Sequence, residues 1–125
     1  MIDKYLAATW KRDGMAWPYL NCWGLVRLAS KELFGRTLQP IDCDVYDKRA
    51  TTKACHEIIT KPMRVTAAES GAIAVVWRGK LCIHVGLVVT VDDKLAVLDI
   101  DEGVPPRVSW IADFERRYLR VEYYA

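Results

Sequence analysis

The chain has 125 residues, of which 52% are hydrophobic and 27% are charged, and its formal net charge is +2. This length fits a single domain, residues 1–125, with enough apolar content for a core that needs neither disulfides nor a metal. Lys and Arg are dispersed rather than gathered in a stripe, which argues against a nucleic-acid partner. No apolar run approaches the roughly 20 residues of a membrane span, so we expect no membrane partner.

The first residues do not have the basic-then-apolar layout of a signal peptide. We therefore expect a cytoplasmic protein, or one released with an assembly or by lysis. Disulfides are not expected without secretion. The spacing of Cys43, Cys55 and His56 matches no common zinc-ligand pattern. The chain has four cysteines, none at Cys-x-x-Cys spacing: Cys22, Cys43, Cys55 and Cys82.

The N-terminal third predicts helical structure around one irregular segment. Residues 2–10 have apolar side chains at loosely helical spacing, and residues 15–20 indicate an extended, aromatic-rich loop. The clearest helix spans residues 22–34. Asn21 is a favourable N-cap for it, and Gly35 is a favourable residue after its last turn.

The rest of the chain predicts a loop, a short helix and then strands. Residues 36–49 indicate a loop, and a helix from Ala50 to Thr60 is ended by Pro62. From Gly71 onward the pattern becomes that of strands, with a helical turn at residues 111–116. Helices followed by strands indicate an α+β domain with a largely antiparallel sheet. The predicted strands are residues 73–77, 81–91, 95–100, 107–110 and 118–124.

Cys22 stands at the start of the clearest helix, directly after the irregular loop. Unpaired backbone N–H groups and the helix dipole favour an anion there, such as a nucleophilic thiolate. Gly24, otherwise a poor helix residue, would let another chain segment or a substrate approach closely. A buried structural cysteine that begins an ordinary core helix is an equally open interpretation.

His84 lies in a predicted strand whose alternate positions are aliphatic, and it shares the other face with Gly86. The small size of Gly86 leaves space beside the imidazole. A lone histidine in a strand is more often a hydrogen-bonded core residue than a catalytic one. The only other histidine, His56, has no comparable setting.

Asp99 is the predicted partner of His84, because residues 91–94 carry a turn signal that joins two strands as a hairpin. With a two-residue loop His84 faces Asp101, and Asp99 is one diagonal step away; with a four-residue loop His84 faces Asp99 directly. Either register puts Asp99 on the face of His84, whereas an odd-length loop or a bulge would separate them. Asp99 interrupts an apolar run, where a carboxylate needs a partner. The alternative is that Asp99 is a surface residue at a strand end.

Two separated motifs resemble those of the NlpC-type papain-like cysteine peptidases. They are Asn-Cys-Trp-Gly-Leu-Val-Arg at residues 21–27 and His-Val-Gly at residues 84–86, and the first looks most like the branch found in phage tails and prophages. The resemblance covers roughly residues 5–105 and implies N-terminal helices packed on an antiparallel sheet. It also implies a cysteine peptidase or amidase that hydrolyses amide bonds in peptidoglycan stem peptides, with Cys22 as nucleophile and His84 as base. Asp99 falls at the third position, where the family usually has His, Asn or Gln.

This interpretation predicts a thiol hydrolase that needs no cofactor and no metal. Its partners would be a peptidoglycan stem peptide and phage tail proteins, and it could be incorporated into a phage tail or virion. We expect four residues to contribute to substrate binding at the cleft, although core packing is equally open for the three aromatic ones: Trp17, Tyr19, Trp23 and Gly86.

Two departures from the family pattern keep other functions open. Asn21 stands where the family usually has Asp, and Ala72 stands after Gly71 where an Asp is common. One alternative is therefore a catalytically inactive papain-like module that binds cell-wall peptide or a tail partner. The other is an acyltransferase or deamidase acting on another substrate, since fold does not fix function.

Overall fold

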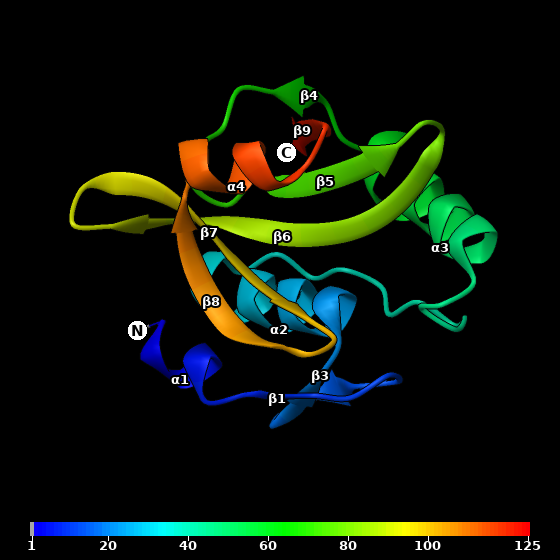
Figure 1. Ribbon diagram of the computed structural model, residues 1–125, viewed down its shortest axis with the longest axis horizontal. Helices are drawn as coiled ribbons and strands as arrows, with labels where there is room; N and C mark the ends of the chain where they lie inside the picture. The colour runs from blue at the N-terminus through cyan, green and yellow to red at the C-terminus, as the bar shows by residue number, and fades with distance from the viewer. Residues whose placement is uncertain (1) are drawn as a thin grey trace.

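The computed structural model describes residues 2–125, which form a mixed α+β structure with two sheets (Figure 1). A small three-stranded sheet has the order β1-β3-β2, and a six-stranded sheet has the order β4-β9-β5-β6-β7-β8. Every pairing in the larger sheet is antiparallel. The α+β class with a largely antiparallel sheet is thus confirmed.

The helices are α1 (Asp3–Leu6), α2 (Cys22–Phe34), α3 (Lys48–Cys55), which continues into a π-helical turn (His56–Thr60), and α4 (Ile111–Arg117). The strands of the small sheet are β1 (Thr9–Trp10), β2 (Met15–Ala16) and β3 (Tyr19–Leu20). Those of the large sheet are β4 (Val65–Thr66), β5 (Ile73–Arg78), β6 (Leu81–Val91), β7 (Lys94–Asp101), β8 (Val104–Trp110) and β9 (Arg120–Tyr124).

Helices cover the large sheet on both faces, α2 on one and α4 on the other (Figure 1). Alternate residues of β5 therefore enter two separate apolar cores. Ile73 and Val75 belong to the core under α2, which also contains Leu25 and Val26, whereas Val76 packs in the core under α4. This explains why β5 is an unbroken apolar run rather than an alternating one.

The expected N-terminal helix is shorter than its periodicity suggested. Only Asp3–Leu6 is helical, and Thr9–Trp10 instead forms a strand that pairs in parallel with Tyr19–Leu20. The expected extended segment at residues 15–20 contains β2 and β3. Backbone pairing with residues ten positions away overrides a weak helical pattern here.

Helix α2 begins and ends where the sequence predicts. The side chain of Asn21 accepts a hydrogen bond from the backbone of Gly24, and Gly35 has the left-handed φ of 68° that ends many helices. Helix α3 begins at Lys48, two residues before the predicted start, because the side chain of Asp47 caps it by accepting from the backbone of Ala50.

The hairpin between β6 and β7 has the two-residue loop that was one of the two registers left open. Asp92 and Asp93 have φ values of 50° and 63°, and Val91 pairs with Lys94. The pairing then runs as far as Leu87 and Leu98. Beyond this last pair the two strands diverge, as Figure 1 shows, and the side chains of His84 and Asp99 meet between them.

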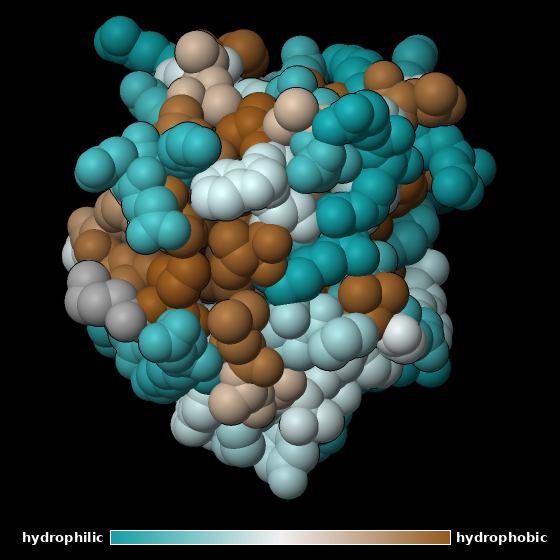
Figure 2. Space-filling view, turned by 60° about the vertical axis from the view of Figure 1, so that its left-hand side comes forward, coloured by the Kyte–Doolittle hydropathy of each residue, from teal (hydrophilic) through white to brown (hydrophobic). Residues whose placement is uncertain are grey.

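The molecular surface carries both hydrophobic and hydrophilic residues. Figure 2 shows hydrophobic residues gathered on one face and bordered by hydrophilic ones. Large exposed hydrophobic side chains occur on several elements and include Leu6, Val65, Trp110 and Leu119. Exposed apolar area alone therefore does not single out a binding surface. Within residues 2–125, no helix combines the length and apolar character needed to cross a bilayer.

Candidate functional site

Cys22 is the first residue of α2 and is half-buried. The helix start is fixed by Asn21, whose Oδ1 accepts from the backbone N–H of Gly24 at 2.7 Å and whose Nδ2 donates to the carbonyl oxygen of Arg12 at 3.0 Å. A side chain at Gly24 would collide with the carbonyl oxygen of Gly14, so this glycine admits another chain segment. The thiol is thereby held at a rigid helix N-terminus, where the backbone favours an anion.

His84 of β6 lies just beyond the last paired residues of the β6–β7 hairpin and is 3% exposed. Its Nε2 donates to Oδ2 of Asp99 at 2.8 Å, and Asp99 is completely buried. The nearest oxygen of Asp101 is 3.9 Å from Nδ1 of the same ring, beyond hydrogen-bond distance. The structure therefore joins His84 to Asp99 and leaves Asp101 half-exposed nearby.

The second ring nitrogen of His84 is directed into the site without a partner. Nδ1 is buried and has no hydrogen-bond partner among residues 2–125, which is unusual for a polar atom. Cys22 lines the same cavity as His84. A proton acceptor beside a thiol is the arrangement that activates a cysteine nucleophile.

The protonated form of His84 is strongly favoured. Burial of the ring, the largest single influence, lowers its pKa, but the hydrogen bond to Asp99, the neighbouring Cys22 sulfur and the negative charges of both groups outweigh burial. Together they raise the pKa of His84 from 6.5 to about 10. An imidazolium beside Cys22 stabilises a thiolate, so these surroundings suit an ion pair of the two groups.

Arg107 of β8 holds the carboxylate of Asp99 from the opposite side. Its Nε donates to Oδ1 and its Nη2 to Oδ2, both at 3.1 Å, which is the two-pronged geometry of a strong Arg–carboxylate pair. Burial raises the pKa of Asp99, but the hydrogen bonds from His84 and Arg107 outweigh it and lower that pKa. Asp99 therefore stays ionised and oriented toward the imidazole.

Two aromatic side chains pack against the His84 ring from the α4 side. The ring centroids of Phe114 and Tyr118 lie 6.4 Å and 5.8 Å from that of His84. The hydroxyl of Tyr118 also accepts a hydrogen bond from Arg107 at 3.4 Å. This packing limits the movement of the imidazole and keeps water from its bond to Asp99.

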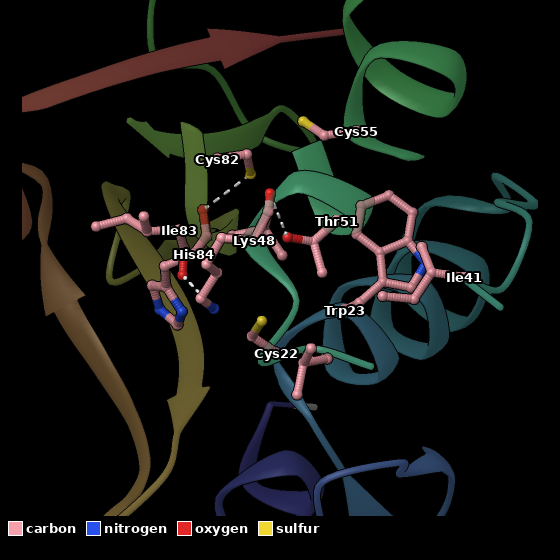
Figure 3. A pocket seen from close by; sticks show the side chains of 11 residues that line it. Cys22, Trp23, Ile41, Lys48, Thr51, Cys55, Cys82, Ile83 and His84 are labelled. Carbon is pink, nitrogen blue, oxygen red and sulfur yellow. Dashed lines mark hydrogen bonds between the residues drawn. The ribbon is translucent and has the colours of Figure 1, made fainter. Parts of the chain in front are cut away.

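Cys22 lines two cavities in the described part of the chain. The smaller, about 30 Å³, is the one drawn in Figure 3; it also contains His84 and is almost entirely apolar. The larger, about 370 Å³, is lined by polar and charged residues as well. Its wall includes the stacked rings of Trp10 and Tyr46, whose centroids are 6.4 Å apart. The volume of the larger cavity falls in the range of small-ligand sites.

The four residues expected to bind substrate occupy different positions. Trp23 lines the smaller cavity, but it is buried and donates from Nε1 to the carbonyl oxygen of Gln39 at 3.0 Å. Trp17 and Tyr19 are exposed and line neither of the cavities that contain Cys22. A Cβ at Gly86 would lie 2.6 Å from the side chain of Val97, so this glycine accommodates the neighbouring strand β7.

Sequence reasoning did not identify three contributors to the site. Arg107 and Tyr46 lie far from the two motifs along the chain, and Lys48 lies in a segment interpreted as a loop. The signal for Arg107 was partial, because a hairpin loop at residues 102–103 places it near Asp99 on the adjacent strand. A regular hairpin would pair Asp99 with Pro106, and only the irregularity between Asp99 and Asp101 brings Arg107 opposite Asp99. No comparable signal existed for Lys48 or Tyr46.

No group of three or more potential metal ligands occurs within the described residues 2–125. No protein-family model matches the chain, and no curated protein matches it significantly.

Proposed function

We propose that this chain is a papain-like cysteine hydrolase in which Cys22 is the nucleophile, His84 the general base and Asp99 the third member of the triad. The observation that carries the proposal is the state of His84. Its Nε2 is bonded to a buried carboxylate, while its Nδ1 has no hydrogen-bond partner among residues 2–125 and shares a cavity with a cysteine at a helix N-terminus.

In the proposed reaction Nδ1 of His84 already holds the proton of the Cys22 thiol, so that the resting site is a thiolate–imidazolium pair. The Nε2–H bond to Asp99 fixes the tautomer of the neutral ring and stabilises the imidazolium. The thiolate attacks the carbonyl carbon of an amide, and the imidazolium then protonates the leaving nitrogen, so that an acyl-enzyme thioester remains. Water, deprotonated by His84, hydrolyses the thioester and restores the free thiol.

The oxyanion formed in this reaction needs hydrogen-bond donors. The backbone N–H of Cys22 is in the first turn of α2, where no intrahelical acceptor exists, and is available for this role. Loss of one such donor typically costs about 3–4 kcal/mol of transition-state stabilisation.

For the substrate we propose an amide bond in a peptidoglycan stem peptide, and for the biological setting a tail-associated cell-wall hydrolase of a phage or prophage, incorporated in the virion. Support comes from the two motifs at residues 21–27 and 84–86 and from the volume of the larger cavity, which is in the range of small-ligand sites.

The test is digestion of purified peptidoglycan with mass analysis of the soluble products. We expect new free amino and carboxyl ends from the natural protein and none from Cys22→Ala. The matched control, Cys43→Ala, removes a thiol outside both cavities and should retain activity. A folded protein with a reactive Cys22 but no products would favour another amide substrate. An unreactive Cys22 would favour an inactive binding module.

A further inference from the structure

Lys48 brings a positive charge into the site from α3, whose first residue it is. Its side chain lines both cavities that contain Cys22. Its Nζ donates to the carbonyl oxygen of Ile83, the residue before His84, at 3.3 Å. In Figure 3 the amine lies between the sulfur of Cys22 and the ring of His84 in projection.

Most of the hydrogen-bonding capacity of Lys48 is unused. An ammonium has three N–H donors, and within residues 2–125 its one side-chain hydrogen bond is to Ile83, with no ion pair. Asp44, a carboxylate close enough to feel its charge, is held by Arg12. Two donors therefore have no acceptor within the described part of the protein, and because Lys48 is only half-buried they are open to water until a substrate anion replaces it.

Other charged residues line the larger cavity but do not neutralise Lys48. Arg78 adds a second cation, and Asp101 and Glu102 contribute carboxylates. Asp101 lies near Nδ1 of His84, at 3.9 Å, so the anionic part of this cavity adjoins the imidazole. The larger cavity contains both positively and negatively charged side chains. Attraction of an anion to Cys22 would therefore depend on the position of Lys48 and not on the net charge of the cavity.

We propose that Lys48 is a specificity-determining residue that binds a carboxylate of the substrate next to the scissile amide. The inference rests on the proposed role of Cys22 as nucleophile. An acidic substrate supplies acceptors for the two unused donors. A neutral analogue that displaces water from the site leaves them unpaired, and such unpaired donors are a strong source of discrimination.

Two alkylating reagents that differ in one charge test the proposal without any knowledge of the natural substrate. Iodoacetate and iodoacetamide each form a bond from the Cys22 sulfur to their methylene carbon and release iodide, but only iodoacetate carries a carboxylate. The measured quantity is the ratio of their rate constants at Cys22, read by peptide mass mapping at low ionic strength. We expect the ratio to fall about fivefold in Lys48→Gln.

Two variants serve as controls. Lys53→Gln removes the same charge from an exposed position of α3 that lines neither cavity, and its ratio should equal that of the natural protein. Lys48→Arg keeps the charge and should keep the ratio. Lys48→Met repeats the test without a polar group, and thermal unfolding of each variant checks the fold.

An unchanged ratio in both Lys48→Gln and Lys48→Met would overturn the inference, as would an equal fall in Lys53→Gln. Neither result would affect the proposed hydrolase. A Cys22 that reacts with neither reagent would contradict the inference and the proposed function together. A ratio that falls as expected, combined with inert peptidoglycan, would support the carboxylate site and direct the search to other acidic amides.

Discussion

The four cysteines of this chain differ sharply in their surroundings. Burial and three nearby aspartates raise the pKa of Cys43. A hydrogen bond with Cys55 and then burial raise the pKa of Cys82. Both effects disfavour thiolates, whereas Cys22 has a helix N-terminus and the His84 imidazole beside it.

We therefore expect Cys22 to react fastest with iodoacetamide near neutral pH, and its rate to fall at least tenfold in His84→Ala, because the variant lacks the cation that stabilises the thiolate. Mass mapping of a partially alkylated sample measures this. First reaction at Cys43 or Cys55, with Cys22 silent in the folded protein, would contradict the assignment.

The third member of the proposed triad can be tested by comparing Asp99 and Asp101, which are both in β7. Asp99 is buried and bonded to His84, whereas Asp101 is half-exposed and beyond hydrogen-bond distance. Asp99→Asn should lower kcat about 100-fold or more, because the tautomer of His84 is no longer fixed. Asp101→Asn should change kcat less than threefold. Equal, small effects would remove Asp99 from the mechanism and leave a Cys22–His84 dyad.

Arg107 should act as a positioning residue, and its effect should be visible in the pH profile. Since Arg107 helps to lower the pKa of Asp99, Arg107→Gln should raise that pKa. Asp99 would then become protonated at a higher pH on acidification, so the acidic limb of the alkylation or activity profile should move to higher pH. Arg116→Gln, a change at an exposed arginine, is the control. Identical profiles for all three proteins would contradict the role.

Asp99 and Arg107 also show how far residue-level prediction reached. The pairing of Asp99 with His84 required only the parity of one hairpin, since either even-length loop places both on one face. Arg107 required the register of a second hairpin, which is irregular between Asp99 and Asp101. A one-residue irregularity reverses the face of every later side chain, and the sequence gives no sign of it.

At the scale of elements, prediction succeeded where both ends carry local signals. Helix α2 has its cap at Asn21 and its left-handed glycine at Gly35, and β6 spans the predicted residues 81–91. The start of β8 was missed because Pro105 and Pro106 lack backbone N–H groups. The structure accommodates them in β8 because this strand is at the edge of the sheet.

The Asn21 cap gives a prediction about a whole helix. Asn21→Ala loses the acceptor for Gly24 and should cost about 1 kcal/mol of stability. Asn21→Asp keeps that acceptor but loses the donor to the Arg12 carbonyl and places a carboxylate beside the thiol. It should also be less stable than the natural protein, and only this variant should need a higher pH for Cys22 alkylation.

Thermal midpoints and pH profiles of alkylation for the three proteins measure both effects. An Asn21→Ala protein as stable as the natural one would show that the cap is unimportant. Faster alkylation of Asn21→Asp at neutral pH would contradict the electrostatic part of the argument.

For the molecule as a whole, the order of helices before strands was enough to predict an α+β domain, because it follows from local periodicity. The strand order was not predicted. The last strand, β9, lies between β4 and β5 and pairs with β5, whose residues are about 50 positions earlier in the chain. Such contacts depend on packing across both cores, which the local pattern of apolar and polar residues does not predict.

The buried charges should make the stability of the folded chain depend on pH in a defined way. The folded-state pKa of His84 is about 10 against an ordinary 6.5, so its contribution is fully present below about pH 6.5 and is lost as the pH rises toward 10. The pKa of Asp99 is lowered from 3.8, so its contribution is present above that value and is lost on further acidification. Both contributions therefore coexist at about pH 4 to 6.5.

Thermal unfolding of the natural protein and of His84→Gln at pH 6, 8 and 10 tests this. His84→Gln lacks the imidazolium, so it should be less stable at pH 6, and the gap in thermal midpoint should narrow steadily toward pH 10 as the natural protein loses its proton. Titrations of groups that do not contact His84 affect both proteins alike and cancel in the difference. A gap that stays constant from pH 6 to pH 10 would mean that His84 is neutral in the folded protein, and the thiolate–imidazolium pair would have to be abandoned.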